Sequence, residues 1–218
     1  MRVCCRYPNE NVDGLEISRI DPAAVTAAYR TDVLATAGAG LQASALAVLE
    51  EDLRSPCTEE IALFRAFADA VAQGADRFVI LDTAPTGHTL LLLDAAETYH
   101  REIQRGHGEV PDPVRQLLPR LRDPDHTHVV IVAVPEPTPV HEARRLAADL
   151  TRAGIEPFAW VVNQSFAATD TQDPVLQARG RSEERWIDEA LAQSPRTAIV
   201  GWQATDPTGA ANLALLAA

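Results

Sequence analysis

The residues with the clearest chemical potential follow a short apolar segment near the middle of the chain. Phe78–Leu81 is followed at once by Asp82, and residues 83–89 then read Thr-Ala-Pro-Thr-Gly-His-Thr. A carboxylate at the end of a buried strand is the kind of group that holds Mg²⁺ in phosphoryl-transfer enzymes. Taken alone, this pattern is more often a helix cap or a loop acid. The Pro-Thr-Gly-His sequence favours a shaped turn that leads into a helix.

A thiol and an imidazole are the next candidates for chemistry. Ser55 and Pro56 predict a helix that begins directly before Cys57. The free N–H groups and the positive end of that helix would stabilise a thiolate, which is a soft ligand. His88 follows Gly87 at the expected start of another helix. The plain alternatives are a small core cysteine and a hydrogen-bonding histidine.

Composition limits the classes of function. The 218 residues are 46% hydrophobic and 23% charged, which is typical of a globular protein. The net charge of −12 disfavours nucleic acid as a partner, because binding to a phosphate backbone needs clustered positive charge. All 19 basic residues other than histidine are arginine. The absence of lysine excludes Schiff-base catalysis and a self-contained P-loop.

The apolar runs and the cysteines indicate a cytoplasmic protein without membrane insertion. The first residues lack the apolar stretch of a signal peptide, and no run approaches the roughly 20 residues that span a bilayer. The three cysteines contain no C-x-x-C pair, which argues against a zinc ribbon.

Short apolar runs alternate with helical patterns along the chain. Five runs are expected to form strands buried on both faces: Leu15–Ile20, Phe78–Leu81, Val129–Val134, Phe158–Val162 and Ala198–Val200. Seven segments show helical patterns: Ala23–Thr36, Leu41–Asp52, Cys57–Gln73, His88–Gln104, Val140–Ala153, Val175–Gln193 and Thr208–Leu216. A polar residue before proline is expected to cap five of these helices: Asp21, Ser55, Thr138, Asp173 and Asp206.

This alternation predicts an α/β fold with a parallel sheet, in which ligands bind at the carboxyl ends of the strands. Residues 106–128 are rich in proline and charge, and we expect them to form the longest surface connection.

The sequence from Asp82 to Thr89 resembles the signature of the arsenical pump-driving ATPases and of their relatives that target tail-anchored membrane proteins. Other segments resemble this family in the same order: 15–23, 50–61, 99–103, 153–155, 161–163 and 206–209. The resemblance is closest to the C-terminal half of the two-half pump subunit. It implies one α/β domain over residues 15–218, a P-loop NTPase-like parallel twisted sheet of the SIMIBI type flanked by helices. Residues 1–14 stay unmatched.

The resemblance implies a metalloid site and a nucleotide switch. Asp82 matches the aspartate on the Mg²⁺ and water side of the nucleotide, and Thr83–Thr89 match the segment that moves with nucleotide state. His88 and Cys57 match ligands of arsenite or antimonite, and Ser55 matches a weaker ligand nearby. The implied cofactors are ATP and Mg²⁺.

The resemblance also implies a site for the adenine base. Asn163 matches the asparagine that reads the base, and Trp202–Pro207, with Trp202, Asp206 and Pro207 as its contact residues, match the loop that lines it. Gly201 departs from the pattern, because the family usually has proline there.

The Gly-rich turn with lysine that binds phosphates in this family is not found in the sequence. The first strand of the sheet is expected to be missing with it. We therefore interpret the chain as the C-terminal part of an arsenite-transporting ATPase that does not hydrolyse ATP by itself.

Two other functions stay open. One is a non-enzymatic module that binds a metalloid or a partner, and the other is a targeting factor for tail-anchored proteins, which the missing C-x-x-C disfavours. The expected partners are a complete ATPase half or a second copy, together with the membrane pump subunit. That pump would give the chain a peripheral location at the inner face of the membrane.

Overall fold

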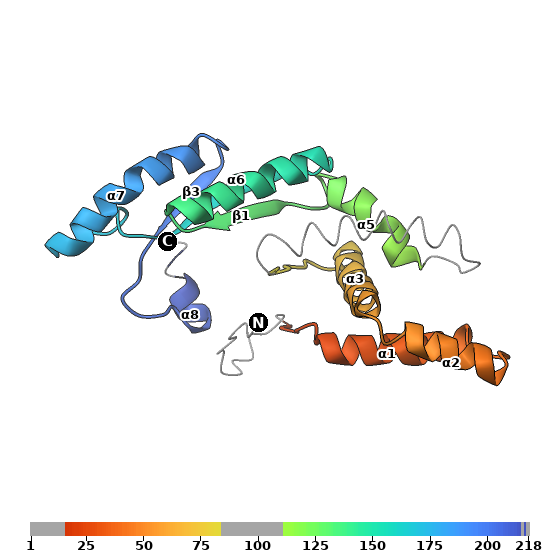
Figure 1. Ribbon diagram of the computed structural model, residues 1–218. Helices are drawn as coiled ribbons and strands as arrows, with labels where there is room; N and C mark the ends of the chain where they lie inside the picture. The colour runs from red at the N-terminus through yellow and green to blue at the C-terminus, as the bar shows by residue number, and fades with distance from the viewer. Residues whose placement is uncertain (1–15, 84–110, 215, 217–218) are drawn as a thin grey trace. The chain divides into compact units, whose positions relative to one another are not determined.

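The computed structural model describes residues 16–83, 111–214 and 216 (Figure 1). They fall in two compact units, which we treat separately. The sheet unit comprises residues 16–18, 128–151 and 156–216 as far as they are described, and the helical unit comprises 19–83, 111–127 and 152–155. The α/β class is confirmed, whereas the single domain over residues 15–218 stays a prediction.

Three parallel strands form the sheet, in the order β1-β2-β3. They are β1 (Val129–Ala133), β2 (Pro157–Ser165) and β3 (Thr197–Gly201). Trp160 of β2 lies opposite Ile131 on one side and Thr197 on the other. The three strands predicted in this part of the chain are therefore confirmed, with β2 extended by a few residues.

Two helices connect these strands, α6 (Pro137–Arg152) and α7 (Pro174–Leu191), and Figure 1 shows α6 running along β1. Because strand order does not reverse and such crossovers are right-handed, both helices pack on the same face. That face carries the buried Trp160 and Val162. The opposite face is exposed in the described residues, with Val130 at 47% and Val132 at 59%. The expectation of strands buried on both faces is wrong there, because no described helix covers the second face.

The helical unit contains α1 (Pro22–Thr36), α2 (Ala43–Asp52), α3 (Pro56–Ala72), the 3₁₀ turn η1 (Gln73–Ala75) and α5 (Asp112–Arg122). Its core is formed where α3 packs against α5, and it contains Phe64, Ala68, Val71, Val114 and Leu117. The sheet unit ends with the short helix α8 (Gly209–Ala214). None of the described helices is long and apolar enough to cross a membrane.

Helix α5 lies where the sequence predicted a surface connection. Val114 and Leu117 are three residues apart and both are buried, so one face of this short helix is apolar. Pro119 lies inside the helix, and charged residues surround the apolar pair. The proline and the charges made this segment resemble a loop in the sequence. The helix is stabilised by its packing against α3.

Two predicted strands are wrong in the described residues. Glu16–Ile20 and Phe78–Leu81 have no regular structure, and Phe78 is 92% exposed. A strand needs the backbone of a neighbouring strand for its hydrogen bonds. Neither segment joins the described β1-β2-β3 sheet, so apolar character alone does not make it a strand.

Two of the five predicted helix caps are confirmed by hydrogen bonds, and a third lies at the predicted position without a capping bond. Asp21 and Asp173 cap α1 and α7, each accepting two backbone N–H bonds. Ser55 is the N-cap residue of α3, but its hydroxyl lies 3.3 Å from Thr58 Oγ1 and makes no capping bond.

The other two proposed caps are wrong. Helix α6 begins at Pro137, so Thr138 lies inside its first turn. Helix α8 begins only at Gly209, beyond Asp206. Both errors concern the exact start of a helix, which the dipeptide pattern does not determine.

We predict that Asp173→Ala lowers the free energy of unfolding of the sheet unit by about 1 kcal/mol, because two N–H groups of α7 lose their acceptor. Urea unfolding followed by tryptophan fluorescence measures this, since all three tryptophans lie in the sheet unit. Asp173→Ser is the control, because serine also caps helices. Equal stability of the alanine variant and the unmodified protein would contradict the prediction.

Candidate functional site

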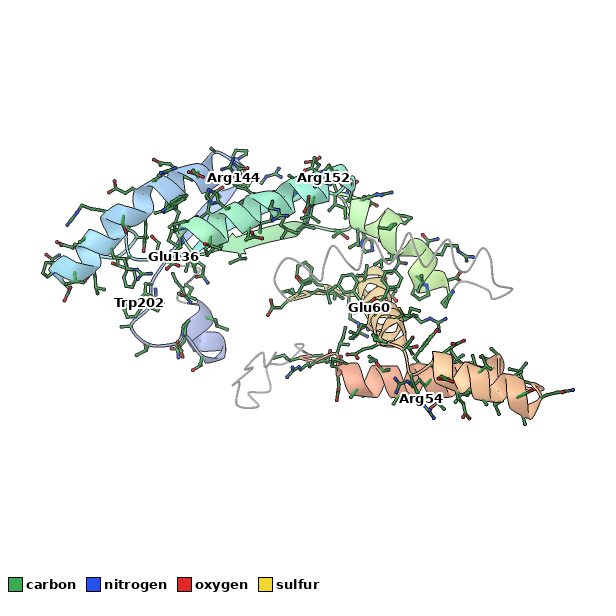
Figure 2. All side chains as sticks on the ribbon, in the orientation of Figure 1. Arg54, Glu60, Glu136, Arg144, Arg152 and Trp202 are labelled. Atoms are coloured by element: carbon green, nitrogen blue, oxygen red, sulfur yellow. The ribbon has the colours of Figure 1, made fainter. Side chains whose placement is uncertain are left out.

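A cavity of about 300 Å³ opens at the carboxyl edge of the sheet. This is the place where open α/β sheets bind ligands. Figure 2 labels two of its residues, Glu136 and Trp202, at the same end of the unit. The lining comes from the segments after β1 and β3, the end of β2 and helix α7: Val134, Pro135, Glu136, Gln164, Phe166, Arg179, Glu183 and Trp202.

Two aromatic rings form one wall of this cavity. The ring centroids of Phe166 and Trp202 lie 5.2 Å apart with an angle of 28° between the planes. The Arg179 guanidinium lies 5.4 Å from the Phe166 ring centroid. Trp202 is 40% exposed, so part of its indole remains accessible. Flat, partly exposed rings next to a guanidinium suit the binding of another planar ring by stacking.

The charges in the cavity disfavour a phosphate group. Arg179 forms an ion pair with Glu136 at 2.5 Å, and its Nε lies 3.9 Å from Glu183 Oε1. Two carboxylates therefore share one guanidinium. The positive charge is already compensated, and the excess negative charge would repel a polyphosphate. The site suits the neutral, planar end of a ligand that can donate hydrogen bonds.

The end of β2 has an irregular backbone directly at the cavity. The pairing with β3 shifts register between Val162 and Ser165, and Gln164 has a φ of +59°. The Gln164 N–H donates a hydrogen bond to Asn163 Oδ1 at 3.0 Å. Left-handed residues other than glycine cluster at functional sites, and bulges redirect side chains. This observation supports a binding role for the end of β2.

Of the predicted base-binding residues, the structure brings Asn163 and Trp202 to this edge, and only Trp202 lines the cavity itself. Asn163 lies near the end of β2, and Trp202 directly follows β3. Trp202 N–H donates to the Ser165 carbonyl at 2.9 Å, which ties the two strand ends together. Asp206 and Pro207 lie further along the loop after β3 and do not line the cavity.

Gly201 allows the loop after β2 to cross the end of β3. A Cβ at this position would lie 2.6 Å from the Ala168 carbonyl oxygen, too close for any side chain. The departure from the family pattern therefore has a local reason in this chain, because proline also carries a Cβ.

The predicted metalloid ligands are only partly described. Ser55 is half-buried at the start of α3, and Cys57 is exposed as its second residue. Their positions at the helix start agree with the sequence expectation. His88 lies outside the described residues. Within the described ranges, no three His, Cys, Asp or Glu side chains form a group able to hold a metal ion.

Asp82 and Thr83 belong to the helical unit and are exposed, without regular structure. The prediction that Asp82 ends a buried strand is wrong in the described residues, because Phe78–Leu81 is itself exposed and unpaired in the sheet.

Sequence reasoning missed Phe166, Arg179 and Glu183. The signal for Glu183 was its spacing, since Gly180, Glu183, Ile187 and Ala190 form the buried stripe of α7. A buried carboxylate requires polar partners, so the position of Glu183 in this apolar stripe could have marked it as a candidate.

Comparison with known proteins identifies the relatives of this chain. The family model for anion-transporting ATPases matches residues 9–109 and 107–200. An arsenical pump-driving ATPase of Escherichia coli is 47% identical over 96% of this chain. A putative arsenical pump-driving ATPase of Halobacterium salinarum is 29% identical over 95% of the chain, and the Arabidopsis thaliana ATPase GET3A is 26% identical over 51%. The chain spans 36% of the length of the E. coli relative.

We predict that Gly201→Ala lowers the free energy of unfolding of the sheet unit by about 1–3 kcal/mol, because the loop that carries Phe166 must move away from the new Cβ. Urea unfolding followed by tryptophan fluorescence is the measurement. Ala198→Val adds bulk to an exposed position of the same strand and should change stability by less than about 0.5 kcal/mol. If both variants change the free energy of unfolding equally, the close approach of Ala168 to Gly201 does not affect stability, and the prediction is wrong.

Proposed function

The chain belongs to the anion-transporting ATPase family, and on this basis we propose that it works as part of an arsenite-transporting ATPase. The family match over most of its residues carries the proposal. The cavity at the carboxyl edge of the sheet supports it, because its place and its rings suit the base of a nucleotide. This chain matches 36% of the length of its E. coli relative, and we assign the other parts of the activity to residues outside that match.

The base of ATP would be held by the end of β2 and by the segment after β3. Trp202 and Phe166 offer the stacking surface, and Asn163 lies on the adjoining strand end. In the family pattern Asp206 and Pro207 belong to the loop that lines the base, although they do not line the cavity described here. When bound, ATP supplies the phosphoanhydride bond whose hydrolysis drives transport.

The phosphates need groups that this sequence does not contain. Asp82 would act on the Mg²⁺ and water side, and Thr83 would belong to the segment that moves with nucleotide state, in keeping with the family pattern. Phosphoryl transfer by P-loop enzymes also needs a lysine and a glycine-rich backbone, and these 218 residues contain no lysine. We therefore assign the phosphate-binding lysine to another part of the protein or to a partner chain.

The metalloid would bind at the start of α3. Cys57 is an exposed cysteine in the first turn of α3, and its sulfur is the soft kind of ligand that a thiophilic metalloid prefers. His88 would add a second ligand, and Ser55 a weaker one nearby. One thiolate is too few for tight capture of arsenite or antimonite, so a complete ATPase half or a second copy must contribute further thiols. The membrane pump subunit would then receive the metalloid.

A non-enzymatic binding module is the second candidate. The absence of lysine favours it, because the chain alone cannot complete the phosphate site. A role in targeting tail-anchored proteins has less support, since GET3A is less similar and matches only 51% of the chain.

We predict that the purified chain binds ADP but does not hydrolyse ATP, with or without arsenite, because the base site lacks its phosphate-binding partner. Calorimetry measures the binding, and phosphate release measures the hydrolysis. Arsenite-stimulated hydrolysis that Asp82→Asn abolishes would contradict this prediction, because a contaminating ATPase would not respond to that substitution.

We predict that Cys57→Ser weakens arsenite binding by at least about tenfold, because the hydroxyl that replaces the thiolate is a hard ligand. Equilibrium dialysis under reducing conditions measures the bound arsenic. The control is a Cys4→Ser, Cys5→Ser double variant, which removes the other two thiols and retains Cys57. The metalloid assignment fails if the control loses arsenite and the Cys57 variant keeps it.

A further inference from the structure

One buried carboxylate holds the loop that forms the aromatic wall of the cavity. Glu183 is 4% exposed, and its Oε2 accepts three hydrogen bonds. The donors are the Ser165 hydroxyl at 3.1 Å, the Phe166 N–H at 2.9 Å and the Ala167 N–H at 3.2 Å. Three donors on one oxygen compensate much of the cost of removing the carboxylate from water. The backbone on both sides of the Phe166 ring is thereby held against α7.

The same residue is also linked to Trp202 through Ser165. The hydroxyl of Ser165 donates to Glu183, and the Ser165 carbonyl accepts the N–H of Trp202 at 2.9 Å. Glu183 therefore acts on both stacked rings, on Phe166 directly and on Trp202 through Ser165. Both rings of the pair stacked 5.2 Å apart are thus linked to one carboxylate.

Helix α7 approaches the loop closely at Gly180. A Cβ on Gly180 would lie 3.0 Å from the Ala167 nitrogen. Gly180 lies one helical turn before Glu183, so the missing side chain brings the carboxylate within reach of the loop N–H groups. The Arg179 guanidinium, 3.9 Å from Glu183 Oε1, adds an opposite charge on the cavity side.

We propose that Glu183 is the positioning residue of this cavity, which holds Phe166 and Trp202 in the arrangement that receives a planar ring. The inference rests on the proposed function for the identity of the ligand, the base end of an adenine nucleotide. The residue does not need to touch the ligand, because it acts through the loop. Glu183 therefore affects the affinity of the chain for the base of the nucleotide and not its affinity for the phosphates.

The test compares Glu183→Ala and Glu183→Gln in the full chain. The first readout is the NMR signal of the Trp202 indole N–H, identified by its loss in Trp202→Phe. The second is binding of ADP, with inorganic tripolyphosphate as a ligand that lacks the base. Glu183→Ala should shift the Trp202 signal and weaken ADP binding about tenfold, the equivalent of roughly one charge-assisted hydrogen bond. Glu183→Gln keeps an acceptor oxygen and should weaken ADP binding only about threefold.

Two controls separate positioning from general stability. Glu184→Ala removes the exposed carboxylate next along α7 and should leave both readouts unchanged. Leu150→Ala removes a buried side chain near the far end of α6, about 20 Å along the helix from Glu136. It should lower stability without moving the Trp202 signal or the ADP affinity.

The proposal is overturned if Glu183→Ala and Leu150→Ala give the same Trp202 signal and the same ADP affinity. If Glu183→Ala does not fold, Glu183→Gln decides, and an ADP affinity equal to that of the unmodified chain overturns the proposal. If the unmodified chain binds no ADP, the proposed function fails, whereas the Trp202 signal still tests the positioning role.

Discussion

The backbone ladder through β2 is the constraint on which the described site depends. Because β2 pairs in parallel with β1 and with β3, all three strands end at the same edge of the sheet. The segments that follow β1 and β3 therefore meet the end of β2, although they lie far apart in the sequence. The bond from Trp202 N–H to the Ser165 carbonyl continues this ladder beyond β3. This common edge is what places the aromatic rings and the carboxylates of the cavity next to one another.

The cavity combines a flat apolar wall with charges that are already paired. Phe166 and Trp202 provide the rings, while Glu136 and Arg179 pair across the opening. Stacking and hydrogen bonding to a neutral ring are favourable there, whereas a phosphate would meet excess negative charge.

Several elements followed from the sequence because their causes are local. Asp21 and Asp173 cap their helices through oxygens only two or three residues from the N–H donors. The parallel strands β1, β2 and β3 were predicted because β-branched and apolar residues form uninterrupted runs there. Phe78–Leu81 has the same character, yet it is exposed, because a strand depends on a neighbour that its own residues do not specify. Helix α5 was missed because its apolar face is small. That face is buried only because α3 packs against it.

The sequence by itself determined the family, the α/β class and the absence of any lysine for phosphate binding, because these follow from residue types and from short motifs such as Asp82–Thr89. Only the tertiary structure decided that Glu183 lies beneath the aromatic wall and that Gly201 must lack a Cβ. Both depend on the path of the loop after β2, which crosses β3 and meets α7. That path brings together residues from α7, β3 and the loop after β2. Their distances cannot be read from spacing along the chain.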